Sequence, residues 1–151
     1  MSMLPEGIVI VCDGGCRNNQ TPDKRVAYGS LAVFVNNQRK QLHYTGPDGR
    51  KVEAWQARVN WQDATNNQAE FKTALMALGY IRELFARSQP AQVTICSDSE
   101  LVVNTALGVN KKFKVEHIRE LAIELKANLE ALPSVKFMWL DNSVVKEILG
   151  H

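Results

Sequence analysis

The first part of the chain alternates between short apolar runs and turn signals. Four runs rich in β-branched residues predict strands, at residues 8–12, 26–35, 41–45 and 52–59. The Asp13-Gly14-Gly15 triplet predicts a turn after the first run, and Asn36-Asn37-Gln38 predicts a hairpin connection after the second. A Gly-Pro-Asp-Gly segment at 46–49 separates the last two runs. The pattern therefore predicts an antiparallel meander of three or four strands.

Further along the chain the apolar positions recur at helical spacings. Phe71, Ala74, Leu78, Ile81 and Phe85 lie three and four residues apart, which is the pattern of a helix with one buried face. Later segments predict a strand, two helices, a strand and a short helix, at 93–96, 99–107, 118–132, 135–140 and 143–149. This alternation predicts an α/β fold in which helices cover the faces of a mixed sheet.

Composition bounds the class of protein. The chain has 151 residues, of which 45% are hydrophobic and 23% are charged. These values predict a single domain spanning residues 1–151 and argue against a disordered, collagen-like or disulfide-stapled chain. No apolar run approaches the roughly 18 residues of a membrane helix, and the first residues lack the features of a signal peptide. We therefore expect a cytoplasmic protein without a membrane partner.

Net charge and cysteine content say less about the function of the protein. Lys and Arg number 18 against 16 Asp and Glu, and the net charge of +2 is compatible with a nucleic-acid partner without implying one. Three cysteines in a chain expected to be cytoplasmic predict reduced thiols. Cys12 and Cys16 have no His nearby in the sequence, which argues against a zinc site.

Three acids stand where predicted elements begin or end, and each has a structural explanation of its own. Asp13 belongs to a common Asp-Gly turn pair, and Glu70 fits a capping-box-like helix start at 67–70. Asp98 lies among several candidate N-cap residues at 97–100. Taken singly, each acid is better explained by local structure than by chemistry.

Their joint placement favours a shared site. Asp13 and Asp98 follow buried strands, and Glu70 opens the helix between them. In α/β sheets the carboxyl ends of strands and the adjoining helix N-termini form the binding crevice. Carboxylates gathered there repel one another, and a divalent cation relieves that repulsion. A set of oxygen ligands without His or Cys favours Mg²⁺ or Mn²⁺.

Three segments that carry these acids resemble ribonuclease H of type 1. They are VCDGGC at 11–16, TNNQAE at 65–70 and CSDSE at 96–100. They occur in the order of that family and on its elements, and the resemblance spans about residues 7–140. It implies a ribonuclease H-like fold with a mixed five-stranded sheet, three antiparallel strands and then parallel strands, flanked by helices.

The resemblance also implies an activity: a metal-dependent endonuclease that hydrolyses the RNA strand of RNA–DNA hybrids and leaves 5′-phosphate and 3′-hydroxyl ends. Asp13, Glu70 and Asp98 match the family's catalytic, metal-binding acids, which hold two Mg²⁺ or Mn²⁺ ions. One ion would activate a water and the other would stabilise the departing 3′ oxygen. The implied partner is the hybrid itself, with no obligate protein partner.

Further residues match positions at which the family contacts the hybrid. They are Gly14, Cys16, Asn18, Asn19, Asn66 and Asn67. Amide and backbone groups there can bond 2′-hydroxyls, which distinguish RNA from DNA. Ser99 either holds a phosphate or caps its helix. The basic cluster of Lys111, Lys112 and Lys114 is either a DNA-phosphate contact or a solvated loop.

The sequence departs from the family in its last helix. The family places a fourth carboxylate about ten to fourteen residues beyond the Trp that matches Trp139, and this chain has no Asp in that window. His151 could replace that acid as a catalytic residue, followed by Glu147, while Asp141 either joins the site or caps the last helix. Alternatively, no residue replaces the fourth acid and His151 is a frayed terminal residue without a role. Trp55, Trp61 and Trp139 are expected to pack beside strands.

Two other functions remain open. The chain could be a non-catalytic module that binds RNA or hybrids and has lost its fourth acid, or a nuclease of the wider superfamily with another nucleic-acid substrate. The three clustered acids favour catalysis, because negative charge beside phosphates weakens binding unless metal is present. The pair Asn66 and Asn67 favours the hybrid as substrate.

Overall fold

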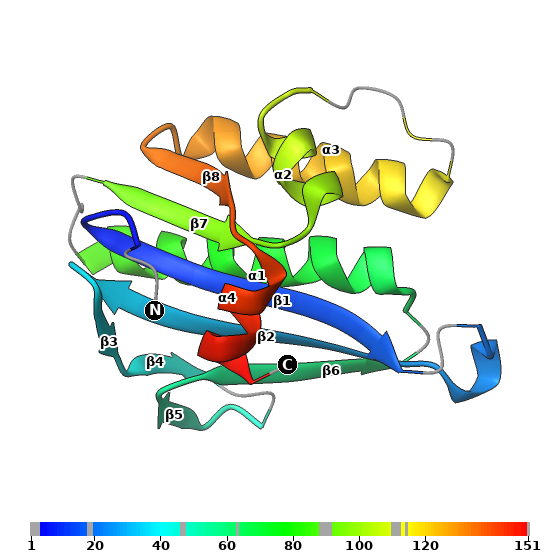
Figure 1. Cartoon of the computed structure of the whole chain (residues 1–151), viewed down its shortest axis with the longest axis horizontal. Helices are drawn as coiled ribbons and strands as arrows, with labels where there is room; N and C mark the ends of the chain where they lie inside the picture. The colour runs from blue at the N-terminus through cyan, green and yellow to red at the C-terminus, as the bar shows by residue number, and fades with distance from the viewer. Residues whose placement is uncertain are drawn as a thin grey trace.

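In the computed structural model a mixed sheet forms the centre of the molecule (Figure 1). The model describes residues 4–17, 20–45, 48–62, 64–87, 92–109, 113 and 115–150. The sheet has the order β3-β2-β1-β7-β8, with β6 also paired to β2. The bounds are β1 Ile8–Arg17, β2 Val26–Val35, β3 Gln38–Lys40, β6 Ala57–Gln62, β7 Val93–Ser97 and β8 Val135–Trp139. Strands β1, β7 and β8 are parallel and β1, β2 and β3 are antiparallel, which confirms the predicted fold class.

Strand β1 is longer than the apolar run predicts. It continues through Asp13, Gly14 and Gly15 to Arg17, and every residue from Ile8 onward pairs with β2. The predicted turn at Asp13-Gly14-Gly15 is therefore wrong. The reason is non-local, because β2 extends far enough to pair with the glycines and keeps them in the sheet. A short 3-10 helix, η1 (Pro22–Lys24), lies between β1 and β2.

The outer edge of β2 is shared between two strands. β3 pairs with Val33–Val35, and β6 pairs with residues 26–31. The hairpin predicted at Asn36-Asn37-Gln38 is confirmed, and both Asn36 and Asn37 have positive φ angles, as such a turn requires. The predicted strand at 52–59 is wrong, because β5 (Lys51–Ala54) pairs with β4 (Leu42–Thr45) in a separate two-stranded sheet and β6 begins only at Ala57.

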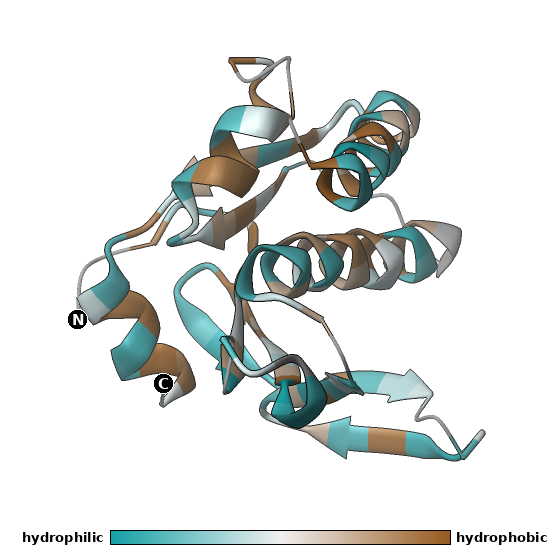
Figure 2. Ribbon diagram, turned by 90° about the vertical axis from the view of Figure 1, so that its right-hand side faces the viewer, coloured by the Kyte–Doolittle hydropathy of each residue, from teal (hydrophilic) through white to brown (hydrophobic). Residues whose placement is uncertain are grey.

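Three helices cover one face of the sheet: α1 (Asn66–Arg87), α2 (Glu100–Ala106) and α3 (Glu116–Ala131). Seen from the side, α1 and α3 lie together on that face (Figure 2). The core below them is apolar and fully buried, and it includes Ile10, Leu31, Phe71, Leu78 and Ile95. The predicted helical face at 71–85 is confirmed. None of the described helices is long and apolar enough to span a membrane.

A single short helix, α4 (Asn142–Leu149), packs on the opposite face (Figures 1 and 2). Its apolar side, Val145, Ile148 and Leu149, contacts a smaller cluster that includes Val9, Val11, Ala32 and Phe34. Side chains from the far edge hold the last turn of α4. Arg39 donates to the carbonyl of Ile148 over 2.9 Å, and Gln56 donates to the carbonyl of Leu149 over 3.0 Å. This face is therefore covered at one end only.

Candidate active site

Asp13 lies where the sheet opens between β1 and β7. The two strands pair only as far as Val11 and Cys96. Asp13, two residues further along β1, therefore has no strand beside it on the β7 side. Asp13 shares its face of the sheet with Val9 and Val11, the face on which α4 packs. The residue is only 9% exposed and its register partner on β2 is Ser30. A carboxyl is thus held on a rigid strand, at the boundary between core and solvent.

Gly14 brings the first turn of α1 against β1. A Cβ built on Gly14 would overlap the carbonyl of Ala69 and lie 2.8 Å from the backbone nitrogen of Glu70. Only glycine allows this approach, because the clash is with backbone, which cannot swing away. Glu70 is consequently fixed beside the strand that carries Asp13.

The helix start at Glu70 is capped by other residues. Gln68 accepts from the backbone nitrogen of Thr65 over 2.7 Å, and the Thr65 hydroxyl accepts from the backbone nitrogen of Gln68 over 3.2 Å. This reciprocal pair is a capping box. The predicted cap at 67–70 is therefore wrong by two residues, and the carboxylate of Glu70 has no part in capping.

Two polar side chains orient Glu70. The hydroxyl of Ser99 donates to its Oε2 over 2.7 Å, and the amide of Asn66 donates to its Oε1 over 3.3 Å. Ser99 is also the N-cap of α2, accepting from the backbone nitrogen of Val102. The predicted capping role of Ser99 is confirmed, and Asp98 is left without one.

Asp98 is held by the last strand and the last helix. The indole nitrogen of Trp139 donates to its backbone oxygen over 3.2 Å, and the amide of Asn142 donates to its Oδ2 over 2.6 Å. Trp139 is 45% exposed, and so is not packed as expected; Trp55, at 54%, is not packed either. Only Trp61 is half-buried, against a small alanine cluster. No sequence pattern pointed to Asn142, whose contact with Asp98 spans 44 positions.

The three acids interact electrostatically. Burial raises the pKa of Asp13 to about 8, helped by the charge of Asp98, a side-chain hydrogen bond to Asp98 and the charge of Glu70. Burial also raises the pKa of Glu70, and the hydrogen bonds from Ser99 and Asn66 oppose that rise while the charge of Asp98 adds to it. The raised pKa therefore keeps Asp13 protonated at neutral pH in the metal-free protein.

Such a cluster fits a divalent cation. Its donors are carboxylate oxygens, and a cation would take the place of the proton on Asp13 and relieve the repulsion between the acids. In the described part of the chain, no group of three or more His, Cys, Asp or Glu side chains is arranged to hold a metal ion as it stands. Cys12 and Cys96 are free thiols whose pKa values burial raises, so they pack as small apolar residues.

The predicted substrate-binding residues divide into two groups. Gly14, Asn66 and Ser99 lie directly at the acids, as described above. Cys16 is half-buried at the end of β1 and donates to the carbonyl of Ala64 over 3.2 Å. Asn67 is exposed on the first turn of α1. Contacts of these residues with a substrate stay predictions.

Of the candidates for a fourth ligand, the structure describes Asp141 and Glu147, and both are exposed. Asp141 is the N-cap of α4, and its Oδ1 accepts from the backbone nitrogen and the hydroxyl of Ser143, which lower its pKa. Glu147 is exposed and lies five positions, or about 140° around the helix, from Asn142, the residue that faces Asp98. Other predicted residues lie outside the described ones: Asn18, Asn19, Lys111, Lys112, Lys114 and His151.

The profile of the RNase H family matches residues 5–145, nearly the whole chain. The chain belongs to the RNase H family. The match includes Asp13, Glu70 and Asp98 together with β1, α1 and β7, on which the site is built. No protein with a curated description is significantly similar in sequence.

Solved RNase H structures share the fold. LC11-RNase H1, isolated from compost and solved in complex with an RNA/DNA hybrid, has 20% identity and a TM-score of 0.69, over 93% of this chain and 89% of that one. The N-terminal RNase H domain of a Mycobacterium tuberculosis protein has 21% identity and a TM-score of 0.66, over 97% and 92%. RNase H1 of Halobacterium salinarum has 16% identity and a TM-score of 0.64, over 92% and 89%. The predicted resemblance to type 1 enzymes is confirmed for the fold.

Proposed function

We propose that this RNase H domain is a metal-dependent endonuclease that hydrolyses the RNA strand of RNA–DNA hybrids. One observation carries the proposal: three acids converge at one opening of the sheet, and local structure needs none of them. The turn expected at Asp13 is strand, the capping box of α1 is Thr65 and Gln68, and the N-cap of α2 is Ser99. Two of the three acids, Asp13 and Glu70, have raised pKa values, and acids perturbed in this way cluster at functional sites, which supports a chemical role.

The chain supplies the ligands and holds them in place. Asp13, Glu70 and Asp98 would hold two Mg²⁺ or Mn²⁺ ions, which lower the pKa of bound water and offset charge at the phosphate. Ser99 and Asn66 hold the two oxygens of Glu70, and Asn142 holds one oxygen of Asp98. Each carboxylate therefore enters the site with one orientation.

Recognition of RNA would come from the amides beside the acids. Asn66 and Asn67 open α1 next to Asp13, where amide groups can bond the 2′-hydroxyls of an RNA strand. LC11-RNase H1 and a foamy viral protease-reverse transcriptase were each solved with an RNA/DNA hybrid, which supports this class of substrate.

A substrate panel tests the proposal. End-labelled RNA–DNA hybrid, single-stranded RNA, double-stranded RNA and duplex DNA of one sequence are incubated with Mg²⁺ and separately with Mn²⁺. We expect cleavage of the hybrid's RNA strand alone, with 5′-phosphate and 3′-hydroxyl products. Cleavage of duplex DNA or of single-stranded RNA at the same rate would contradict the proposal and favour a superfamily nuclease with another substrate.

One contact favours a second candidate, a hybrid-binding module without activity. The amide of Asn142 already occupies an oxygen of Asp98, and it brings no negative charge to the site. Asn142→Asp separates the two candidates. Cleavage by the natural chain supports the enzyme; cleavage that appears only in Asn142→Asp, with hybrid binding in both, supports the binding module.

A further inference from the structure

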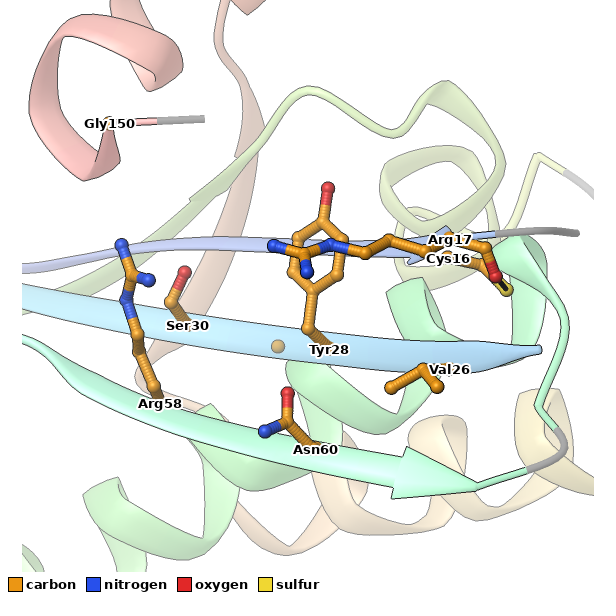
Figure 3. Close-up of a pocket in the computed structure, with 9 residues that line it drawn as sticks. Cys16, Arg17, Val26, Tyr28, Ser30, Arg58, Asn60 and Gly150 are labelled. Atoms are coloured by element: carbon orange, nitrogen blue, oxygen red, sulfur yellow. Dashed lines mark hydrogen bonds between the residues drawn. The ribbon is translucent and has the colours of Figure 1, made fainter. Parts of the chain in front are cut away.

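A polar hollow lies on the α4 face of the sheet, beside the acids (Figure 3). It has a volume of about 470 Å³ and rests on β1, β2 and β6, with the end of α4 at one wall. We call it the arginine groove, after its polar lining of Arg17, Tyr28, Ser30, Arg58 and Asn60. Figure 3 shows these side chains on one face of the sheet, the face toward Gly150 of α4.

The strand register places the groove next to Asp13. Asp13 pairs with Ser30, and Ser30 pairs in turn with Arg58, so these three side chains form one row across the sheet. Neighbouring strands lie about 4.8 Å apart, which puts Arg58 about 10 Å from Asp13 at the backbone. Arg17 lies on Asp13's own strand, two pleats further along. The groove therefore continues from the acids without an intervening element.

Tyr28 joins the two regions. Its ring lies across Gly15 of the neighbouring strand, where a Cβ would overlap the phenol oxygen. Gly15 stands between Asp13 and Arg17 on the same face of β1. Burial and the charge of Asp13 raise the pKa of Tyr28, and Arg17 opposes that rise. The phenol thus stays a hydrogen-bond donor at the border between acids and groove.

The groove carries positive charge that a ligand can reach. Arg17 and Arg58 are both exposed, and within the described residues neither forms an ion pair with an acid. The lining as described contains no Asp or Glu. Guanidinium groups present planar pairs of donors that match phosphate oxygens. Two of them in one hollow stand out in a chain whose net charge is only +2.

We propose that the arginine groove binds the phosphodiester backbone of the strand that is cut, on the segment leaving the acids. The inference rests on the proposed function, because it takes the hybrid as ligand. A nucleic-acid strand fits better than a free nucleotide, because the lining offers polar groups along three strands and the one aromatic ring of its described residues, Tyr28, lies against Gly15. Arg17 and Arg58 would contact phosphates, and the exposed amide of Asn60 would donate between them.

Binding in the absence of chemistry tests the groove. Fluorescence anisotropy measures the Kd of labelled RNA–DNA hybrid in EDTA, in an Asp13→Asn background, at several salt concentrations. We expect Arg17→Ala and Arg58→Ala each to weaken binding about 5- to 10-fold and to reduce the slope of log K against log salt by about 1. Arg58→Lys should keep the salt slope, because lysine keeps the positive charge. It should lose part of the affinity, because lysine lacks the planar pair of donors of a guanidinium group.

The matched control is Arg82→Ala, an exposed arginine on α1 on the opposite face. It should leave both Kd and slope unchanged. The inference is overturned if the Arg17→Ala/Arg58→Ala double variant binds hybrid with the same Kd and the same salt slope as Arg82→Ala. Micromolar binding of ADP that the double variant alone loses would also overturn it, because such binding would assign the groove to a nucleotide. Circular dichroism confirms that each variant folds.

Failure of the groove and failure of the proposed function are distinguishable. If the natural chain binds hybrid through both arginines but never cleaves it, the proposed function fails and the groove stands. If it cleaves hybrid and the double variant does so with the same KM and salt dependence, the groove fails and the function stands.

Discussion

The two faces of the central sheet differ in how they are covered. Ile10, Cys12 and Leu31 face three helices and are buried along the whole sheet. On the other face α4 covers only one end, over Val9 and Val11. Beyond that end the same face carries Asp13, Ser30 and Tyr28, which are polar. One face is apolar core along its whole length. On the other face, β1 changes from core residues at Val9 and Val11 to an acid of the candidate site at Asp13.

That change explains how a small domain positions buried acids. The first half of β1 is held by packing on both faces, so the second half projects into the open edge as a rigid support. The covered face contributes as well, because Gly14 seats α1 and thereby fixes Glu70. Stability comes from one face and chemistry from the border of the other, so variants on the two faces should affect different measurements.

The largest effect is expected at that border. Asp13→Asn removes one carboxylate from the cluster and should lower the rate of hybrid cleavage by about a thousandfold or more, because metal-dependent chemistry loses a ligand. The measurement is kcat on end-labelled hybrid in Mg²⁺. Asp48→Asn, an exposed acid in the turn between β4 and β5, is the control and should cleave normally. Equal rates in the two variants would contradict the assigned role of Asp13.

The covered face should dominate stability. Leu78→Ala deletes a fully buried side chain of α1 and should lower the free energy of unfolding by about 2–5 kcal/mol. Arg58→Ala on the open face should change it by no more than about 0.5 kcal/mol. Urea unfolding followed by circular dichroism measures both. A loss above 2 kcal/mol for Arg58→Ala would mean that the open face is structural.

A substitution at Gly14 should affect both stability and cleavage. Gly14→Ala places a Cβ against the backbone of Ala69 and Glu70, and should cost about 1–3 kcal/mol of stability together with much of the cleavage rate. Gly79→Ala, within α1 and with open space around its Cα, is the control and should stabilise by about 0.5–1 kcal/mol. Thermal melts and cleavage rates measured in parallel would show whether seating α1 serves the site.

The smallest effect is a pH dependence of the metal-free protein. The folded state raises the pKa of Asp13 to about 8, so it binds a proton that the unfolded chain releases near pH 4. The free energy of unfolding of the metal-free protein should therefore fall as pH rises from about 4 to 8. In EDTA, we expect Asp13→Asn to be more stable than the natural chain by about 1–2 kcal/mol at pH 8 and by less at pH 5. Urea midpoints at both pH values measure this, and an identical difference in stability at the two pH values would contradict the raised pKa of Asp13.

Much of the fold could be predicted because its signals are local. The strand at 26–35 and the helical face at 71–85 follow from hydrophobic period, and three acids followed from where such elements begin and end. The end of β1 could not be predicted, because two glycines stay in the strand only by pairing with Tyr28 and Gly29 of β2. Local propensity indicated a turn, and long-range pairing decided against it.

The rest of the site depends on contacts between distant residues. Asn142 lies on a short helix whose position on the sheet is set by packing, so its bond to Asp98 leaves no pattern in the sequence. The arginine groove likewise joins Arg17 of β1 to Arg58 of β6 through the register of three strands. Spacing along the chain shows neither, because both arise from tertiary structure.

We propose that Asp13, Glu70 and Asp98 form one cation site at the open edge of the sheet. Anomalous diffraction from crystals soaked in Mn²⁺ tests it most directly. We predict anomalous peaks that contact carboxylate oxygens of all three residues at about 2.1 Å, the distance typical of octahedral Mg²⁺ sites. Peaks elsewhere on the molecule, in crystals of a protein that still cleaves hybrid in Mn²⁺, would contradict the claim.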